Sequence, residues 1–167
     1  LREKQLPIIE SFKKNYLEKF GGPLPVFIPE VSIQAIQPIN QNFDFEGFCA
    51  PTVLFQDPYG PQDRTIDLST PEVFQLLTYE EDFSQTCSWD GTITIAESGQ
   101  LNALRLITKN LLAIDMSTGT TIDWLTQHIV FPLEVPIDVS QGDVIALHFS
   151  YQGGDSLNAF SNSLEVR

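Results

Sequence analysis

Hydrophobic residues near the start of the chain recur every three or four positions, a spacing that places them on one face of a helix. They are Leu6, Ile9, Phe12, Tyr16 and Phe20. Pro7 is tolerated in a first helical turn, and Gly21-Gly22-Pro23 ends the helix because proline cannot continue it. We therefore predict an amphipathic helix over residues 6–20 whose apolar face needs something to pack against.

From residue 25 onward the spacing changes to two, with apolar and polar residues alternating as in half-buried strands. The alternation is clearest in two segments, 31–35 and 144–151. Further strands are predicted at 43–55, 92–95, 104–114, 124–131, 132–139 and 159–166, with Pro132 and Pro136 at edges or bulges. Turns are predicted at 57–63, 89–91, 98–99, 117–121, 141–143 and 153–155.

One segment, residues 66–77, fits two structures. Thr70 and Pro71 suit the start of a short helix, whereas Val73 to Leu77 equally suit a buried strand. With either choice the chain has about eight to ten short strands separated by turns. The pattern predicts a mainly β fold, a barrel-like or distorted β-sandwich of antiparallel strands with one N-terminal helix.

Length and composition favour one globular domain. The 167 residues are 42% hydrophobic, which is enough for a real core. No apolar run reaches the ~20 residues of a membrane span, and no segment resembles a secretory leader. We therefore expect a cytoplasmic protein. The first residue is Leu rather than Met, which suggests an excised fragment or a processed chain.

The net charge of −13 narrows the classes of partner. Such a field repels phosphate backbones and anionic lipids, so nucleic-acid binding and membrane binding are disfavoured. It attracts cationic partners such as a Lys- or Arg-rich peptide. Acidity that serves only solubility is the competing explanation.

The sequence offers no catalytic or metal-binding set. Cys49 and Cys87 lie far apart without a Cys-x-x-Cys partner, and we expect two buried thiols in a reducing compartment. His128 and His148 stand alone, without ligand spacing. No Gly-x-Ser-x-Gly turn exposes a nucleophile. We expect neither a resident metal nor hydrolase chemistry.

Several short segments, taken in order, point to a known family. They are Phe27-Ile28-Pro29, Leu68 to Val73, Gly99 to Leu104, Asp123 to Gln127, Val130 to Leu133, Pro136-Ile137 and Gly142 to Ile145. In order and spacing, residues 23–167 resemble the substrate-binding β-barrel of the protein arginine methyltransferase type of S-adenosylmethionine-dependent enzyme. Residues 1–22 resemble the last helix and glycine turn of the Rossmann-like cofactor domain that precedes this barrel.

The rest of that cofactor domain has no counterpart in the sequence. No strand is followed by Gly-x-Gly-x-x-Gly, and the glutamates that hold arginine in the family belong to the missing part. The resemblance implies a substrate-recognition and dimerisation half that is not catalytic alone and binds no cofactor itself. S-adenosylmethionine is implied for the full-length enzyme, with the missing domain, a basic protein or peptide substrate and a homodimer as its partners.

The resemblance also suggests substrate-binding residues. Family members typically place Thr-His-Trp at the edge of the active site, where this chain has Ile122-Asp123-Trp124. The replaced histidine puts arginine in doubt as the substrate. We predict that Asp123, Trp124 and Gln127 contact the substrate. The alternatives are an exposed turn acid for Asp123, core packing for Trp124 and a structural hydrogen bond for Gln127.

Two further hypotheses concern surfaces. The family inserts its dimerisation arm in the region of residues 57–89, where Phe74, Leu76 and Leu77 form an apolar patch. A different function class is an independent ligand-binding β-sandwich of the carbohydrate-binding type. Such a module would expose a flat row of aromatic side chains, for which the candidates are Tyr59, Tyr79, Trp89 and Tyr151.

Overall fold

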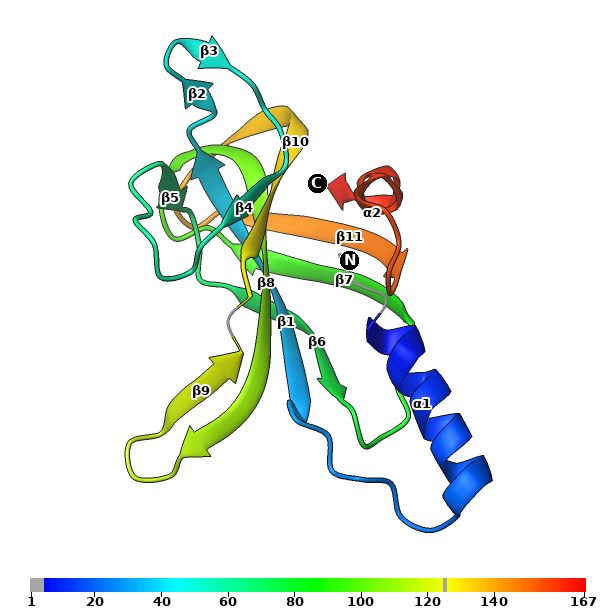
Figure 1. The fold of residues 1–167 in the computed structure, drawn as a ribbon. Helices are drawn as coiled ribbons and strands as arrows, with labels where there is room; N and C mark the ends of the chain where they lie inside the picture. Colours follow the sequence, from blue (N-terminus) through cyan, green and yellow to red (C-terminus); the bar gives the residue numbers. More distant parts are fainter. Residues whose placement is uncertain (1–4, 125) are drawn as a thin grey trace.

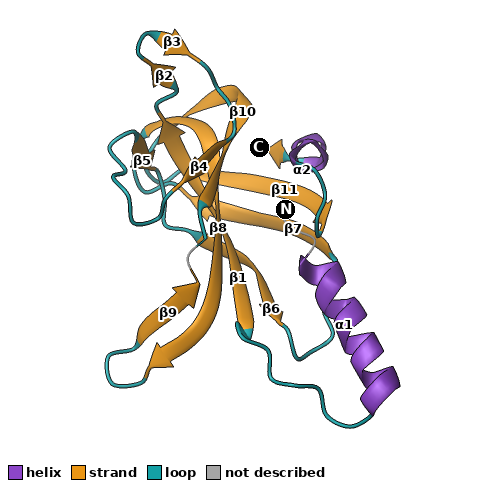
Figure 2. Cartoon of the chain, in the orientation of Figure 1, coloured by secondary structure: helices purple, strands orange, loops and turns teal. Residues whose placement is uncertain are grey.

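The computed structural model describes residues 5–124 and 126–167, and it confirms a mainly β, antiparallel fold (Figures 1 and 2). The elements are α1 (Gln5–Phe20), β1 (Val31–Gln41), β2 (Asp44–Phe45), β3 (Phe48–Cys49), β4 (Leu54–Gln56), β5 (Thr65–Asp67), β6 (Glu72–Thr78), β7 (Thr86–Thr94), β8 (Gly99–Asp115), β9 (Thr120–Trp124), β10 (His128–Val139), β11 (Val144–Gln152), α2 (Leu157–Ser163) and β12 (Glu165–Val166). The sheets form a distorted sandwich rather than a closed barrel.

The larger sheet is organised around two long strands. β1 and β8 pair antiparallel from Val31 opposite Leu111 to Ile39 opposite Ala103. Along its other edge β1 pairs with β6 and then β5, while β8 pairs with β9 and then β10, and β4 completes the sheet beside β10. In Figure 1 the lower ends of β1, β6, β8 and β9 extend below β7 and β11, and α1 lies to their right.

The main core lies between this sheet and a smaller one in the order β12-β11-β7. Leu104 and Leu106 of β8 face Leu147 and Phe149 of β11 across the core, and Phe160 of α2 closes it. The ring of Phe149 lies 5.2 Å from that of Phe160, within the range of favourable aromatic pairs. Burying each such side chain stabilises the fold by about 1.5–3 kcal/mol.

The predicted N-terminal helix is confirmed as α1. It ends at Gly21 and Gly22, which both have positive φ angles, 60° and 83°. Its apolar face is only partly covered, since Leu17 and Phe20 remain 47% and 64% exposed. Lys13 is buried and donates to the Glu81 carbonyl, 2.5 Å away, which fastens the helix to the loop before β7. No helix in the described residues is long and apolar enough to cross a membrane.

The predicted turn at residues 89–91 is wrong, because this segment is continuous strand within β7. Gly91 is needed there for close packing rather than for a turn. A Cβ atom at Gly91 would lie 2.2 Å from Cζ2 of Trp89, whose indole ring covers the glycine. Trp89 in turn packs against Phe74 and Phe149.

The predicted strand at residues 159–166 is also wrong. Ser156 caps a short helix, α2, by accepting a hydrogen bond from the backbone N–H of Ala159. Phe160 of this seven-residue helix then reaches the core, and β12 is the strand that remains. The alternating pattern here was too short to separate a buried helical turn from a strand.

Two further boundaries differ from the prediction, and one open alternative is decided. Residues 43–55 form the β2–β3 hairpin and the separate strand β4, because Glu46 and Gly47 both adopt positive φ angles at a tight turn. Residues 66–77 contain strand β6 and no helix, so the strand alternative is the correct one. Residues 128–139 form one strand, β10, whose register shifts between Pro132 and Ile137, as expected of a bulge.

A Gly91→Ala substitution should destabilise the protein by about 1–3 kcal/mol, because the new methyl group must displace the Trp89 ring from its site. Urea unfolding gives the free energy directly. In a Trp89→Ala background the ring is gone, so the same substitution should be neutral or should stabilise by up to about 1 kcal/mol. An equal cost in both backgrounds would show that the ring does not set this requirement.

Candidate functional site

A cavity of about 560 Å³ lies where the larger sheet extends beyond the core. We call it the amide cavity. Its walls are the ends of β1, β6, β8 and β9, the start of α1 and the adjoining ends of β7 and β11. Its lining is Gln5, Leu6, Pro29, Ser32, Gln34, Phe74, Gln75, Leu77, Tyr79, Gln85, Cys87, Leu106, Thr108, Asn110, Trp124, Thr126, Gln127, Ile129, Tyr151 and Gly153. The volume is within the range of small-molecule sites, about 300–1,000 Å³.

The floor of the cavity is polar because the inward face of β8 changes character along the strand. Leu104 and Leu106 enter the core, whereas Thr108 and Asn110 on the same face line the cavity. The Thr108 hydroxyl donates to Oε1 of Gln34, 2.7 Å away, and Gln34 donates to the Ser32 hydroxyl at 2.8 Å. Neighbouring polar groups thus fix the orientation of one another.

One cavity amide is only partly satisfied. Asn110 donates through Nδ2 to the Thr126 hydroxyl at 3.2 Å, and its Oδ1 is buried with no hydrogen-bond partner. Turning the amide over would exchange the two atoms and leave the other one unpaired. Leaving a buried polar atom without a partner costs about 1–3 kcal/mol. A ligand that supplies the partner would recover this free energy.

The titratable groups of the lining are uncharged at neutral pH. Burial raises the pKa of the Tyr79 phenol, and a hydrogen bond to Ser32 opposes this only in part. Burial also raises the pKa of the Cys87 thiol, which is hydrogen-bonded to Tyr151. The pKa of Tyr151 is raised by burial and by Cys87. A thiol of this kind is a weak nucleophile, since the thiolate is the reactive form.

The structure brings together two of the three residues predicted to contact the substrate. Trp124 and Gln127 line the amide cavity, and Trp124 is 61% exposed. Asp123 does not line it, because successive strand residues point to opposite faces of the sheet. Its side chain, only 9% exposed, lies 2.9 Å from Nζ of Lys109. The Asp123 carboxylate is therefore neither an exposed turn acid nor an unpaired charge.

Sequence reasoning did not single out Gln34, Thr108 and Asn110. The alternation along β8 could have indicated them. After Leu106 the next residues on the inward face, Thr108 and Asn110, are polar, which indicates that this end of the strand extends beyond the core. Gln34 lies opposite Thr108 in the β1–β8 pairing, so the same register carries both into the cavity.

Other expected sites can be placed as well. No group of three or more His, Cys, Asp or Glu residues in the described part of the chain has the geometry of a metal site. Cys87 is buried as predicted, but Cys49 is exposed at the β2–β3 hairpin, which corrects the expectation of two buried thiols. Tyr59 is 77% exposed whereas Tyr79 is 2% exposed, so the four candidate aromatics do not form one exposed row.

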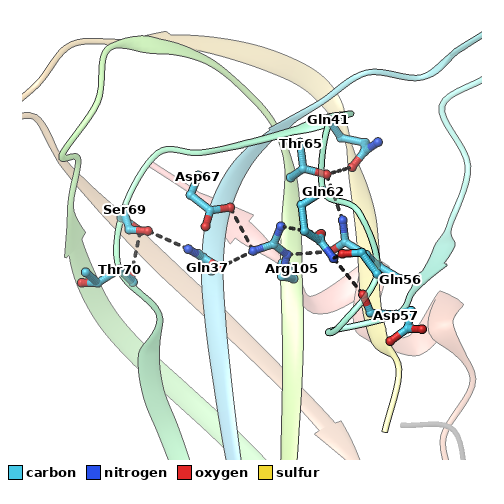
Figure 3. Close-up of polar contacts among 11 residues, drawn as sticks. Gln37, Gln41, Gln56, Asp57, Gln62, Thr65, Asp67, Ser69, Thr70 and Arg105 are labelled. Atoms are coloured by element: carbon cyan, nitrogen blue, oxygen red, sulfur yellow. Dashed lines mark hydrogen bonds and ion pairs between the residues drawn. The ribbon is translucent and has the colours of Figure 1, made fainter.

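The opposite face of the larger sheet carries a buried arginine, Arg105, shown in Figure 3. Its Nε donates to Gln56 at 2.8 Å, and its Nη1 donates to Gln37 at 2.8 Å and to Asp67 at 2.9 Å. Gln62 joins this cluster and donates to the Asp57 carbonyl at 2.7 Å. The guanidinium thus holds the loop at residues 57–64 against the sheet.

Known proteins resemble this chain in structure but not in sequence. No protein-family model and no curated protein matches the sequence. The fold is similar to a chain of the Trypanosoma brucei PRMT1 enzyme–prozyme heterotetrameric complex with AdoHcy, with a TM-score of 0.55 and 10% sequence identity. The match covers 86% of this chain and 54% of that one, so this chain spans about half of its structural neighbour. At this identity the likeness concerns the fold.

Replacing Arg105 by leucine should destabilise the protein by about 3 kcal/mol or more, because Gln37 and Gln56 lose a buried charged donor. Hydrogen exchange should rise across residues 57–64, which the guanidinium holds in place. The matched control is Arg167→Leu. The Arg167 side chain is 77% exposed, and among the described residues its guanidinium pairs with Glu165 alone, so its loss should cost less than about 0.5 kcal/mol. Equal effects would refute the role assigned to Arg105.

His128 should make stability depend on pH. Burial and the charge of Arg105 lower its pKa below the ordinary value of 6.5, against the opposing effect of Asp57 and Asp67. The unfolded chain therefore binds a proton at a higher pH than the folded chain does, and the free energy of unfolding should fall as the pH drops below about 6.5.

Urea unfolding at about pH 7.5 and pH 5.5 measures this loss. The His128→Gln variant should lose less stability over the interval than the unaltered protein. A loss that is the same with and without His128 would contradict the prediction.

Proposed function

We propose that this chain is the substrate-recognition and dimerisation half of an S-adenosylmethionine-dependent methyltransferase that resembles the protein arginine methyltransferases, and that it is not catalytic alone. One observation carries the proposal. The fold matches that of a chain from a PRMT1 complex over 86% of this chain but over only 54% of the other. The segments that resemble the family in sequence lie within residues 23–167, after the Gly21-Gly22 turn.

The surface of α1 supports a neighbouring cofactor domain of the Rossmann type. Ile8, Leu17 and Phe20 are exposed on the helix, and Val26 and Ile28 are 74% and 75% exposed in the segment that follows. A second hollow of about 330 Å³ lies between α1 and this segment. Several large apolar side chains exposed on one helix and the segment after it are typical of an interface. We assign it to the domain that residues 1–22 would end.

In the complete enzyme the amide cavity would form one wall of the site, with Trp124 and Gln127 facing the acceptor. Asp123 would act on the other side of β9, holding Lys109 and so the β8–β9 hairpin in place. The surplus of exposed carboxylates would steer a basic protein or peptide substrate toward the enzyme. The oligomeric PRMT1 neighbour supports an oligomeric parent, which we take to be a homodimer in the cytoplasm.

The residues of this chain do not suit S-adenosylmethionine itself. A nucleotide cofactor is held where a parallel strand meets a helix N-terminus, with a carboxylate on the ribose. The paired strands described here are antiparallel, and no carboxylate lines the amide cavity. The cofactor therefore belongs to the other domain in this proposal.

The alternative is an independent ligand-binding β-sandwich module. The size of the amide cavity favours it, since a cavity of this volume can bind a ligand without a second domain. A flat carbohydrate platform is disfavoured by the burial of Tyr79. The two functions differ in what should precede this chain in its gene.

The test is to read the gene upstream of Leu1 and to express the whole reading frame. We expect a nucleotide-binding domain there, methyl transfer from labelled S-adenosylmethionine to a protein of a cell lysate, and no heat of binding when the cofactor is titrated into residues 1–167 alone. A secretion signal upstream, or tight cofactor binding by residues 1–167, would refute the proposal.

A further inference from the structure

The lining of the amide cavity lacks charge in a protein that is rich in charge. Of the whole chain 19% is Asp, Glu, Lys or Arg, so 19% of twenty residues would average about four. None of the twenty described lining residues is one of these, and none is a histidine. Glu10 accepts a hydrogen bond from Gln85 but does not itself line the cavity.

Carboxamides replace the charges. Six of the lining side chains are amides, and five carry a hydroxyl group. The amides are Gln5, Gln34, Gln75, Gln85, Asn110 and Gln127, and the hydroxyls belong to Ser32, Tyr79, Thr108, Thr126 and Tyr151. Each amide presents a donor and an acceptor side by side. A ligand with the same pairing can form two hydrogen bonds to one side chain.

Three of these amides have hydrogen-bonding groups without a partner among the described residues. Asn110 has the buried unpaired oxygen described above. No side-chain hydrogen bond joins Gln75 or Gln127 to another described residue, and Gln127 is exposed. Trp124 also lines the cavity, lies opposite Asn110 in the β8–β9 pairing, and offers the apolar surface of its indole to the body of a ligand.

We propose that the amide cavity binds an uncharged ligand that carries a carboxamide, such as a peptide amide or an N-acetylated sugar. A guanidinium, ammonium or carboxylate would lose its hydration there without meeting an opposite charge, and this costs more than the loss for a neutral group. An amide would lose less and would supply the donor that Oδ1 of Asn110 lacks. Trp124 would cover its apolar part.

This inference rests on the proposed function in one respect: in a methyltransferase the bound ligand would be the methyl acceptor. Binding itself is a property of the described chain and needs no cofactor. If the ligand fails to bind, the methyltransferase proposal stands with a different acceptor. If methyl transfer fails, the cavity remains a binding site of the independent module.

The test is a titration of the whole chain followed by NMR, at about 0.15 M salt so that the net charge does not attract cations unspecifically. The chain has two tryptophans, and their indole N–H signals act as site and control. Trp124 lines the cavity, whereas Trp89 packs in the core against Phe149. A ligand in the cavity should shift the Trp124 signal and leave that of Trp89 in place.

Matched probes separate charge from amide chemistry. Acetyl-glutamine methylamide should shift the Trp124 signal at lower concentration than the corresponding glutamate and arginine probes. N-acetylglucosamine should do so at lower concentration than glucose, which lacks the amide. The more effective of the two favoured probes identifies a peptide or a sugar as the source. A preference for the arginine or glutamate probe, equal binding of glucose, or no shift with any probe would overturn the proposal.

Two variants test the assigned amides. Asn110→Asp and Gln127→Glu replace an amide by a carboxylate of the same shape. Each should lower the affinity for the favoured probe at least about threefold. Gln127 is exposed, so its variant should fold normally. Asn162→Asp adds the same charge on the exposed side of α2 and should leave the affinity unchanged. Equal affinities in all three variants would count against the proposal.

Discussion

The antiparallel pairing of β1 with β8 is the constraint on which the rest of the structure depends. Nine residue pairs run from Val31–Leu111 to Ile39–Ala103. The two strands are longer than the hydrophobic core that they help to form, so they extend beyond it. At one end of the ladder the inward residues are Ile36, Leu104 and Leu106, which are buried between the sheets. At the other end the inward residues are polar and line the amide cavity. A register slip of one residue would turn those polar side chains outward and bring Arg105 to the core face.

The same pairing explains why the second face of the sheet is closed by a loop. Arg105 lies next to Gln37 across the ladder, on the face that carries no second sheet. A charged donor there can be buried only if several acceptors surround it, because isolated buried charges cost far more than paired ones. Gln37, Gln56, Gln62 and Asp67 supply these acceptors, and three of them come from edge strands or a loop: Gln56 from β4, Asp67 from β5 and Gln62 from the loop between these strands. On this face the polar contacts of Arg105 lie beside a small buried apolar cluster of Ile39, Phe43, Ala103 and Val130, and both hold the covering segments against the sheet.

The sequence predicts this architecture correctly in the segments whose hydrophobic pattern fits only one kind of element. The apolar stripe of α1 and the alternation of β11 both predict the correct element, because each pattern continues over many residues and such a pattern is hard to mistake. Gly91 was misread because glycine marks a turn and also a position under a large ring, and only the Trp89 contact distinguishes them. The fold of residues 157–163 depended on Phe160 reaching the core, which local pattern does not contain. For the site, Trp124 and Gln127 came from a family resemblance. The pairing of Asp123 with Lys109 depends on which side chains share a face of the sheet, and the predicted turn at 117–121 and strand at 124–131 miss most of β9, which spans Thr120–Trp124.

The acidic surface of this protein and the uncharged lining of the amide cavity have different roles. All described acidic residues except Glu10, Asp123 and Asp155 are exposed, and Asp123 is compensated by Lys109. Exposed carboxylates are screened over about 10 Å and hold a cation by roughly 1 kcal/mol or less per pair. Surface charges of this kind affect the rate of encounter with oppositely charged molecules more than they select a ligand. Selection requires groups fixed in place and shielded from water. In the described residues these groups are the amides and hydroxyls at the end of the β1–β8 ladder, so the acidity of the surface carries no information about the charge of the ligand that binds within.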